Sequence, residues 1–137
     1  MTTGMTLHQC TYEVINSDVD TFHCYRDATG AVLDQKTQLL RITPAQIVNL
    51  KPLIFTVGNR DFEFPANAQI WPHALNALIG GESDHLYLVV SDNGAISTQG
   101  ITCICGYSFL ERYYTVFDTT KQRVGFATTP FTTADSN

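Results

Sequence analysis

The segment FDTTKQRVG, residues 117–125, contains an aspartate followed by two threonines. A positioned carboxylate can act as a general acid or base by moving a proton to or from a reacting group. The same pattern also begins hairpins, because an aspartate at the first corner of a turn bonds nearby backbone N–H groups. The aromatic and β-branched residues 113–117 and the segment 123–127 flank it, as expected for two paired strands. We therefore predict that Asp118 is a turn residue and that any catalytic acid lies elsewhere.

The other candidate acids also fit structural positions. Asp18 and Asp20 belong to Ser-Asp-Val-Asp at residues 17–20, a pattern typical of a helix start, where negative charge is favoured. Asp92 begins the turn signal Asp-Asn-Gly. The sequence therefore offers no persuasive pair of carboxylates for acid–base catalysis.

Histidine and cysteine side chains are the usual ligands of transition metals, but their spacing does not favour a metal site. No C-x-x-C or H-x-x-x-H pattern occurs among Cys10, Cys24, Cys103, Cys105, His8, His23, His73 and His85. We predict no metal and no cofactor. Cys103 and Cys105 would point to the same face of one strand, a poor geometry for a disulfide, so we predict that they do not bond each other. Buried thiols or one Cys10–Cys24 bridge are the remaining alternatives.

Length and charge limit the class of protein. The chain has 137 residues, of which 44% are hydrophobic, so we expect residues 1–137 to form a single domain with a buried core. The net charge of −5 argues against a nucleic-acid partner. No stretch approaches the roughly 20 apolar residues of a membrane span, so no membrane partner is expected. The first ten residues lack the features of a signal peptide, and if the chain is complete as given the protein would be intracellular.

Short apolar runs separated by turn signals predict a mainly β domain. Strands are expected at residues 39–42, 53–57, 61–64, 86–90 and 101–105, and on both sides of Asp118. Short helices are expected near residues 18–27, 44–49 and 108–112. For the second of these, Thr43 is the predicted N-cap, Pro44 the first helical residue, and Gln46 the side chain that reaches back to the cap. Residues 71–81 are expected to be irregular, with Trp71 in the core.

Several ordered motifs resemble one protein family. Residues 107–127, YSFLERYYTVFDTTKQRVGFA, resemble the C-terminal end of the pepsin-like aspartic proteases, and the hairpin that begins LIFTVG at residue 53 and Ile-Cys-Gly at 104–106 resemble further elements of it. Residues 67–72 and 127–133 are similar to its basidiomycete members, the polyporopepsin group. The resemblance covers residues 25–137 well and residues 1–24 poorly. It implies a mainly β C-terminal lobe of the pepsin-like acid protease fold, a secreted fungal aspartic endopeptidase acting on peptides or proteins at acid pH, and Asp118 as a hairpin corner.

The catalytic aspartate of the family is the residue that this chain lacks. In the C-terminal lobe that acid lies in an Asp-Thr-Gly-Thr/Ser motif, with which Thr-Thr-Gly-Met-Thr at residues 2–6 aligns. Thr2 occupies the position of the aspartate, and its hydroxyl does not titrate near pH 3–7. We therefore assign no catalytic residue. If residues 2–6 form the active turn, Gly4, Met5 and Thr6 would line the substrate cleft.

Two hypotheses follow from the resemblance and the missing acid. The first is a truncated lobe that is inactive alone and binds a peptide or protein substrate only if the other lobe is supplied. The alternative is a non-catalytic fungal binding or immunomodulatory protein that reuses the lobe fold. A homodimer would bring together two Thr2 hydroxyls and no carboxylate dyad, so it would not restore catalysis. Sheet edges left uncovered by missing strands would favour self-association.

Overall fold

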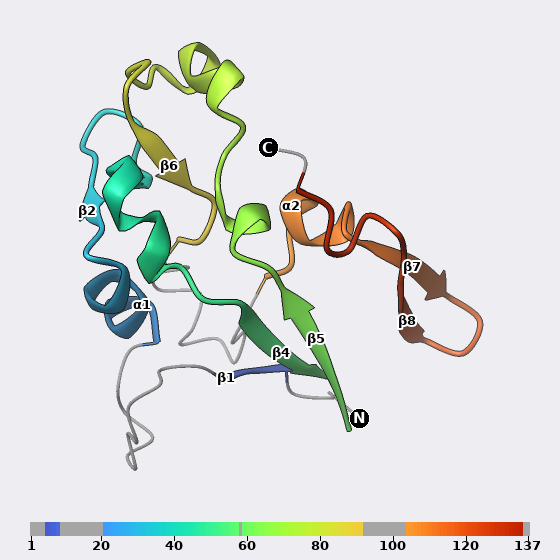
Figure 1. The fold of residues 1–137 in the computed structure, drawn as a ribbon. Coiled ribbons are helices and arrows are strands. Elements are labelled where there is room, and N and C mark those ends of the chain that lie inside the picture. Colours follow the sequence, from blue (N-terminus) through green and yellow to red (C-terminus); the bar gives the residue numbers. More distant parts are fainter. Residues whose placement is uncertain (1–4, 9–20, 58, 92–103, 136–137) are drawn as a thin grey trace.

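The computed structural model of the chain describes residues 5–8, 21–57, 59–91 and 104–135. Within these residues, two three-stranded sheets and a two-stranded hairpin are joined by short helices (Figure 1). The predominance of strands over helices confirms the predicted mainly β fold. None of the helices in this part of the chain is long and apolar enough to cross a membrane.

The first sheet has the strand order β1-β4-β5, with β1 at Met5–His8, β4 at Leu53–Val57 and β5 at Arg60–Phe64. All pairs are antiparallel, and β4 and β5 form a hairpin in which Val57 pairs with Arg60. Leu53 and Phe55 are buried while their neighbours are less so, which is the alternation expected of a strand with one face on the core. The predicted bounds of β4 are confirmed.

The second sheet has the order β2-β3-β6, with β2 at Val32–Leu33, β3 at Leu40–Ile42 and β6 at Leu86–Leu88. Leu40, Ile42 and Leu88 are almost completely buried. Strand β6 is shorter than predicted, because its partner β3 begins at Leu40, the residue that pairs with Leu88. On its other edge Leu88 forms a single antiparallel bridge with Ile70, next to which the Val89 N–H donates to the carbonyl of Gln69. The end of this strand is therefore decided by where its partner begins.

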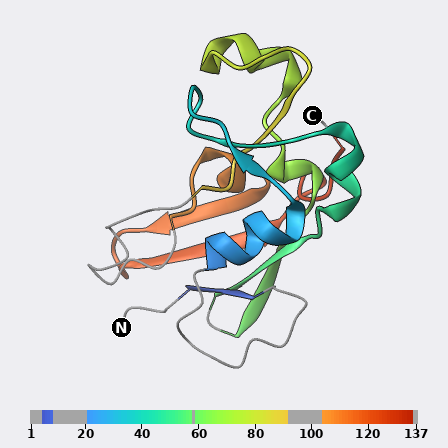
Figure 2. The ribbon, with the colours of Figure 1, turned by 90° about the vertical axis from the view of Figure 1, so that its left-hand side faces the viewer.

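Helix α1, Thr21–Thr29, and the 3-10 helix η1, Pro44–Asn49, lie close together on one side of the molecule (Figure 2). Helix α1 ends at Thr29, and Gly30 follows it with a φ of 69°, the left-handed conformation that glycine adopts readily. At the start of η1 the Thr43 N–H donates to Gln46 Oε1 at 2.8 Å, which confirms the predicted cap. The predicted start of this helix, at residues 17–20, lies outside the described residues.

Two more 3-10 helices follow, η2 at Asn67–Gln69 and η3 at His73–Ile79. The prediction that residues 71–81 are irregular is wrong for η3. Pro72 precedes this helix and Gly80, with a φ of 71°, follows it. Proline at the start of a helix and glycine just past its end are a known signature of helices, so the sequence contained a pattern that indicates η3.

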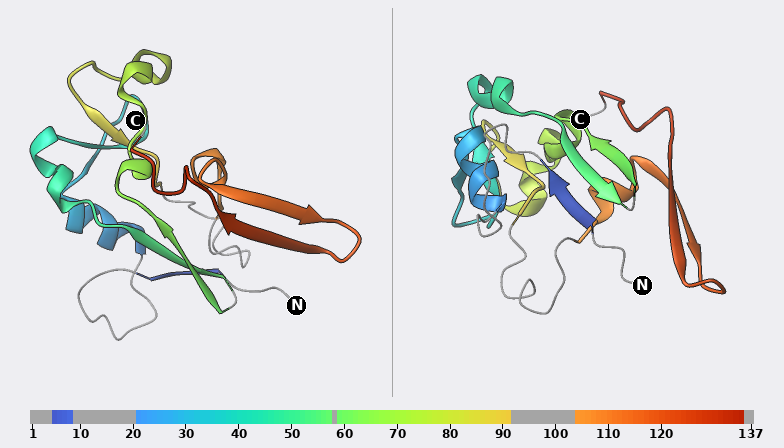
Figure 3. Two further views of the ribbon diagram at one scale, coloured as in Figure 1. Left: turned by 45° about the vertical axis from the view of Figure 1, so that its right-hand side comes forward. Right: turned by 90° about the horizontal axis from the view of Figure 1, so that it is seen from below.

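The chain ends in helix α2, Tyr107–Leu110, and the antiparallel hairpin of β7, Tyr113–Asp118, and β8, Arg123–Thr128. The hairpin extends away from the rest of the molecule (Figure 3). Residues 104–105 are not in a strand, contrary to the predicted strand at 101–105, whose other residues lie outside the described part.

Aromatic side chains join the first sheet to α2 and the base of the hairpin. The Phe109 ring lies 5.1 Å from that of Phe55 and 5.8 Å from that of Phe126, and both contacts are edge-on. Phe62 makes edge-on contacts with Tyr113 and Phe126 at 5.5 and 5.6 Å. Such edge-to-face pairs add to the free energy gained by burying the rings.

The cysteines are described only in part. Cys24 forms a disulfide bond. Cys10 and Cys103 lie outside the described residues, so the suggested Cys10–Cys24 bridge and the absence of a Cys103–Cys105 bond stay predictions.

Candidate functional site

The predicted active turn falls at the edge of the described structure. Thr2 and Gly4 lie outside the described residues. Met5 and Thr6 begin β1, where they pair with Val57 and Thr56 of β4. The backbone at these two residues is therefore strand, and the active turn suggested for residues 2–6 does not extend over them. Their role in lining a substrate cleft stays a prediction.

Asp118 has the structural role that the sequence predicts. It ends β7, and its Oδ1 accepts a hydrogen bond from the Lys121 N–H at 3.0 Å. Its Oδ2 accepts from Arg123 Nε at 2.9 Å, across the strand pair. Because both oxygens hold the turn, Asp118 is a hairpin corner. Asp18, Asp20 and Asp92 lie outside the described residues.

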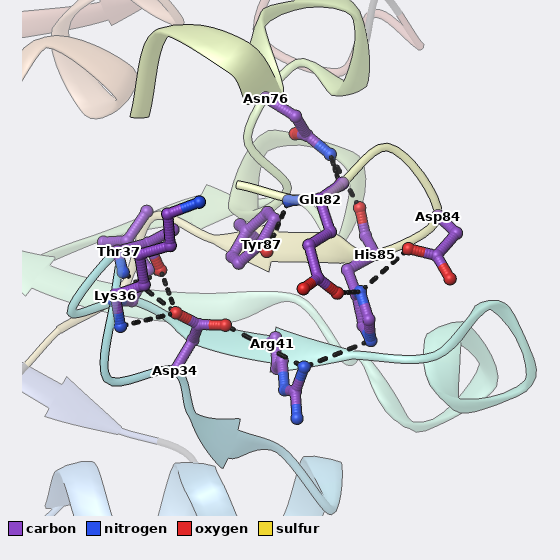
Figure 4. A network of polar contacts seen from close by, with 10 residues as sticks. Asp34, Lys36, Thr37, Arg41, Asn76, Glu82, Asp84, His85 and Tyr87 are labelled. Carbon is purple, nitrogen blue, oxygen red and sulfur yellow. Dashed lines mark hydrogen bonds and ion pairs between the residues drawn. The ribbon is translucent and has the colours of Figure 1, made fainter. Parts of the chain in front are cut away.

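A cluster of titratable side chains lies between η3 and β6 (Figure 4). His85 Nδ1 is 3.0 Å from Glu82 Oε2 and 3.0 Å from Asp84 Oδ1. Asn76 is buried and donates through Nδ2 to the carbonyls of Glu82 and His85, which fixes the backbone of this segment. We call Glu82, Asp84 and His85 the 82–85 cluster.

Arg41 of strand β3 contacts the 82–85 cluster. Arg41 Nη1 is 3.2 Å from His85 Nε2 and 3.9 Å from Asp34 Oδ2. Asp34 Oδ1 accepts from the N–H groups of Lys36 and Thr37, at 2.9 Å each. The Thr37 hydrogen bond is the main cause that lowers the pKa of Asp34 below its ordinary value.

The 82–85 cluster does not have the properties of a proteolytic dyad. Two carboxylates that share a proton must be held together where water cannot screen their repulsion. The side chains of Glu82 and Asp84 are 62% and 79% exposed, and both face an imidazole. Ligand-type atoms of the three residues lie within 4.8 Å of one another, but exposed acidic groups often gather without an ion, and we assign no metal here.

The sequence shows the three residues of this cluster but not the approach of Arg41. Glu-Ser-Asp-His at residues 82–85, directly ahead of a predicted strand, is visible in the sequence. The approach of Arg41 depends on the pairing of Arg41 with Tyr87 in the second sheet. That register follows from packing and cannot be deduced from the spacing of residues 41 and 85.

The β7–β8 hairpin exposes apolar side chains on both faces. Phe117 and Val124 pair across the strands and are 64% and 50% exposed. Tyr114 and Val116, on the opposite face, are 66% and 47% exposed. The tip also borders an open hollow. Exposed apolar patches of this kind often mark surfaces that bind another protein segment. We call these four residues the hairpin patch.

Comparisons with known proteins identify relatives over most of the chain. The profile of the family described as "Eukaryotic aspartyl protease" matches residues 6–129. Polyporopepsin of Irpex lacteus is 55% identical over 118 residues, which are 86% of this chain and 35% of that protein. Gastricsin of Homo sapiens is 36% identical over 101 residues, which are 74% of this chain and 24% of that protein.

A solved structure of the same family has a similar fold. The crystal structure of an aspartic proteinase from Irpex lacteus matches with a TM-score of 0.79 and 55% identity, over 85% of this chain and 34% of that one. The fold is therefore that of a pepsin-like aspartic proteinase, as the motifs at residues 53–58 and 107–127 had implied. The chain spans about a third of the length of polyporopepsin and about a quarter of that of gastricsin. The family match begins at residue 6, so it does not include Thr2.

Proposed function

Because the chain belongs to the eukaryotic aspartyl protease family, we propose that it represents the C-terminal lobe of a secreted fungal aspartic endopeptidase and is inactive by itself. In the family, two carboxylates share one proton, so that one acts as base toward water and the other as acid toward the peptide carbonyl. This chain has Thr2 where its lobe would carry one of them. Catalysis would require both a restored aspartate and a second lobe.

The observation that carries the proposal is the combination of high identity with partial coverage. More than half of the aligned residues are shared with polyporopepsin, yet they correspond to only 35% of that protein. The hairpin patch supports the need for a partner, since apolar side chains on both faces of a strand pair are typical of a sheet covered on both sides. A peptide substrate would bind only when a second lobe completes the cleft.

A second candidate function is a non-catalytic binding protein that reuses the lobe fold. The same hairpin patch favours it, because a partner protein could cover these side chains. Self-association through the patch or through unpaired sheet edges is part of this proposal. In this case the missing acid would be a property of the mature protein.

A pair of chimaeras distinguishes the two functions. In the first, residues 25–137 replace the matching segment of Irpex lacteus polyporopepsin, which keeps that protein's own residues ahead of the segment. In the second, residues 1–137 are used, so that Thr2 takes the place of the aspartate. We expect acid endopeptidase activity from the first and none from the second. A folded first chimaera without activity would contradict the lobe function and favour the binding protein.

The genomic sequence upstream of the codon for Met1 offers an independent check. An in-frame signal peptide followed by a lobe with an Asp-Thr-Gly motif would support the secreted endopeptidase. A stop codon directly upstream, in a gene that is transcribed as given, would favour the binding protein.

A further inference from the structure

Arg41 lies between two parts of the structure that carry titratable side chains. Its guanidinium lies between the Asp34 carboxylate, in the turn between β2 and β3, and the His85 ring, at the start of β6 (Figure 4). Only the His85 contact, at 3.2 Å, is within hydrogen-bond distance; the Asp34 oxygen is 3.9 Å away. Arg41 thus bonds one acceptor while a second lies close by.

The contact with Arg41 indicates which nitrogen of the His85 ring is the acceptor. A guanidinium has donors and no acceptor, so His85 Nε2 must accept and must carry a lone pair. In a neutral imidazole the proton is then on Nδ1, which lies 3.0 Å from Glu82 Oε2 and from Asp84 Oδ1 without a hydrogen bond to either. The ring therefore lies between a cation on the Nε2 side and two carboxylates on the Nδ1 side.

We propose that His85 and Arg41 form a pH-sensitive switch, in which protonation of His85 at Nε2 moves the Arg41 guanidinium from His85 to Asp34. A second proton on the ring removes the only lone pair that Arg41 uses and places two positive groups against each other. The carboxylates of Glu82 and Asp84, 3.0 Å from Nδ1, attract the charged ring while the Arg41 guanidinium repels it, so Arg41 is the group that moves. Histidine is the side chain whose protonation ordinarily changes between pH 5 and 8.

Asp34 has one carboxylate oxygen available for the Arg41 guanidinium. Its Oδ1 is occupied by the backbone N–H groups of Lys36 and Thr37 and by the Thr37 hydroxyl, while Oδ2 faces Arg41. The Thr37 and Lys36 bonds keep the pKa of Asp34 below its ordinary value, with Arg41 contributing in the same direction. The carboxylate therefore stays charged while a histidine takes up its proton.

The other neighbours do not compete for either group. The Tyr87 ring lies 6.5 Å from the His85 ring, and its hydroxyl accepts from the Glu82 N–H. The Lys36 side chain lies against Gly80, on the far side of Asp34 from Arg41. The Asn76 bonds to the carbonyls of Glu82 and His85 do not depend on the ring proton. Acid therefore breaks the contact between Arg41 and His85, while the pairing of β3 with β6 beside the cluster is kept.

The switch is tested on the intact chain by nitrogen NMR between pH 8 and 5. At high pH we expect His85 as the Nδ1–H tautomer, with a hydrogen-bonded Nε2. As the ring takes up its proton, the Arg41 Nη signals should shift with the same pH profile. In Asp34→Asn the guanidinium loses its charged second acceptor, so its Nη protons should exchange with water at least about tenfold faster in acid than in the unchanged chain. Arg26→Gln, at an exposed ion pair on α1, is the matched control and should leave all of these signals as they are.

Two results would overturn the switch. One is a neutral His85 with its proton on Nε2 at high pH. The other is an Arg41 signal that stays constant while His85 titrates. Crystal structures at pH 8 and 5 provide a second readout that needs no variant: the distance from Arg41 Nη1 to Asp34 Oδ2 should fall from 3.9 Å to about 2.9 Å, and an unchanged contact with His85 at pH 5 would contradict the proposal.

Discussion

Gln69 is the polar residue on which three segments of the core converge. It is fully buried in η2, and its Oε1 accepts a hydrogen bond from the Tyr25 hydroxyl of α1 at 3.0 Å. Its Nε2 donates to the carbonyls of Lys51 and Phe64, at 2.8 and 3.2 Å. A buried network whose members are all satisfied specifies one arrangement of the segments that it joins.

We predict that Gln69→Leu destabilises the fold by about 2–4 kcal/mol, because the buried Tyr25 hydroxyl and two carbonyls lose their partner while the volume is kept. Urea unfolding followed by circular dichroism measures this change. Gln35→Leu is the control, since residue 35 lies in an exposed turn. Equal midpoints for the two variants would show that the Gln69 network contributes nothing to stability.

Tyr113 gives a prediction for alkaline pH. Burial and, next, the charge of Glu63 raise the pKa of Tyr113 to about 12, from an ordinary value of 10. Its hydroxyl donates to the carbonyl of Glu63. The unfolded chain therefore loses this proton near pH 10 and the folded chain near pH 12, so stability is full below pH 10 and falls as the pH rises from 10 to 12.

An ultraviolet titration of tyrosinate checks this. The folded chain should show an absorbance step near pH 12 that the chain in urea lacks, and Tyr113→Phe should make that step smaller. Tyr107→Phe, at a residue that is 81% exposed, should leave the late step as it is. A Tyr113→Phe protein with an unchanged late step would contradict the assignment.

At the scale of elements, the sequence predicted those whose signals are local. The alternation in LIFTV set the bounds of β4, and Thr43, Pro44 and Gln46 set the start of η1. The end of β6 was predicted wrongly because it depends on where its partner β3 begins, at Leu40, which no pattern within residues 86–90 contains. The same limit applies to the candidate site. Asp118 was predicted from its own turn, whereas the Arg41–His85 contact depends on strand register.

Helix α2 has only four residues, so its stability must come from packing and not from its own hydrogen bonds. Phe109 is its buried side chain and contacts rings of the first sheet and of the hairpin. We predict that Phe109→Ala costs about 3–5 kcal/mol and increases amide exchange along β7 and β8, since the hairpin loses the ring that holds its base. The control Phe131→Ala removes a ring that is 68% exposed and should cost far less. Exchange in the hairpin that is the same in both variants would argue against this role of α2.

At the scale of the whole molecule, the share of its relatives that the chain covers and the identity of residue 2 together predict that the chain has no proteolytic activity. Each carboxylate of the family's dyad is needed for proton exchange with water and substrate, and positioned acid–base groups contribute about 10²–10⁴-fold each. In the proposed function Thr2 stands at one position of the dyad, and the 118 aligned residues correspond to 35% of polyporopepsin. We therefore expect no measurable cleavage of denatured haemoglobin at pH 3–5 and no high-affinity binding of statine-type transition-state analogues.

The variant Thr2→Asp separates the two causes of the expected inactivity, which are the threonine at residue 2 and the lack of a second carboxylate. In a monomer it should restore nothing, because the second carboxylate is still absent and residues that act as a unit are not additive. In a homodimer that brings two copies of residue 2 together, it should restore weak cleavage that a statine-type inhibitor blocks. Size-exclusion chromatography of the same samples identifies which case applies. Inhibitor-sensitive cleavage by the unmodified chain would show that other acids carry the reaction, and Asp118, whose carboxylate holds the hairpin turn, would be the first to substitute by asparagine.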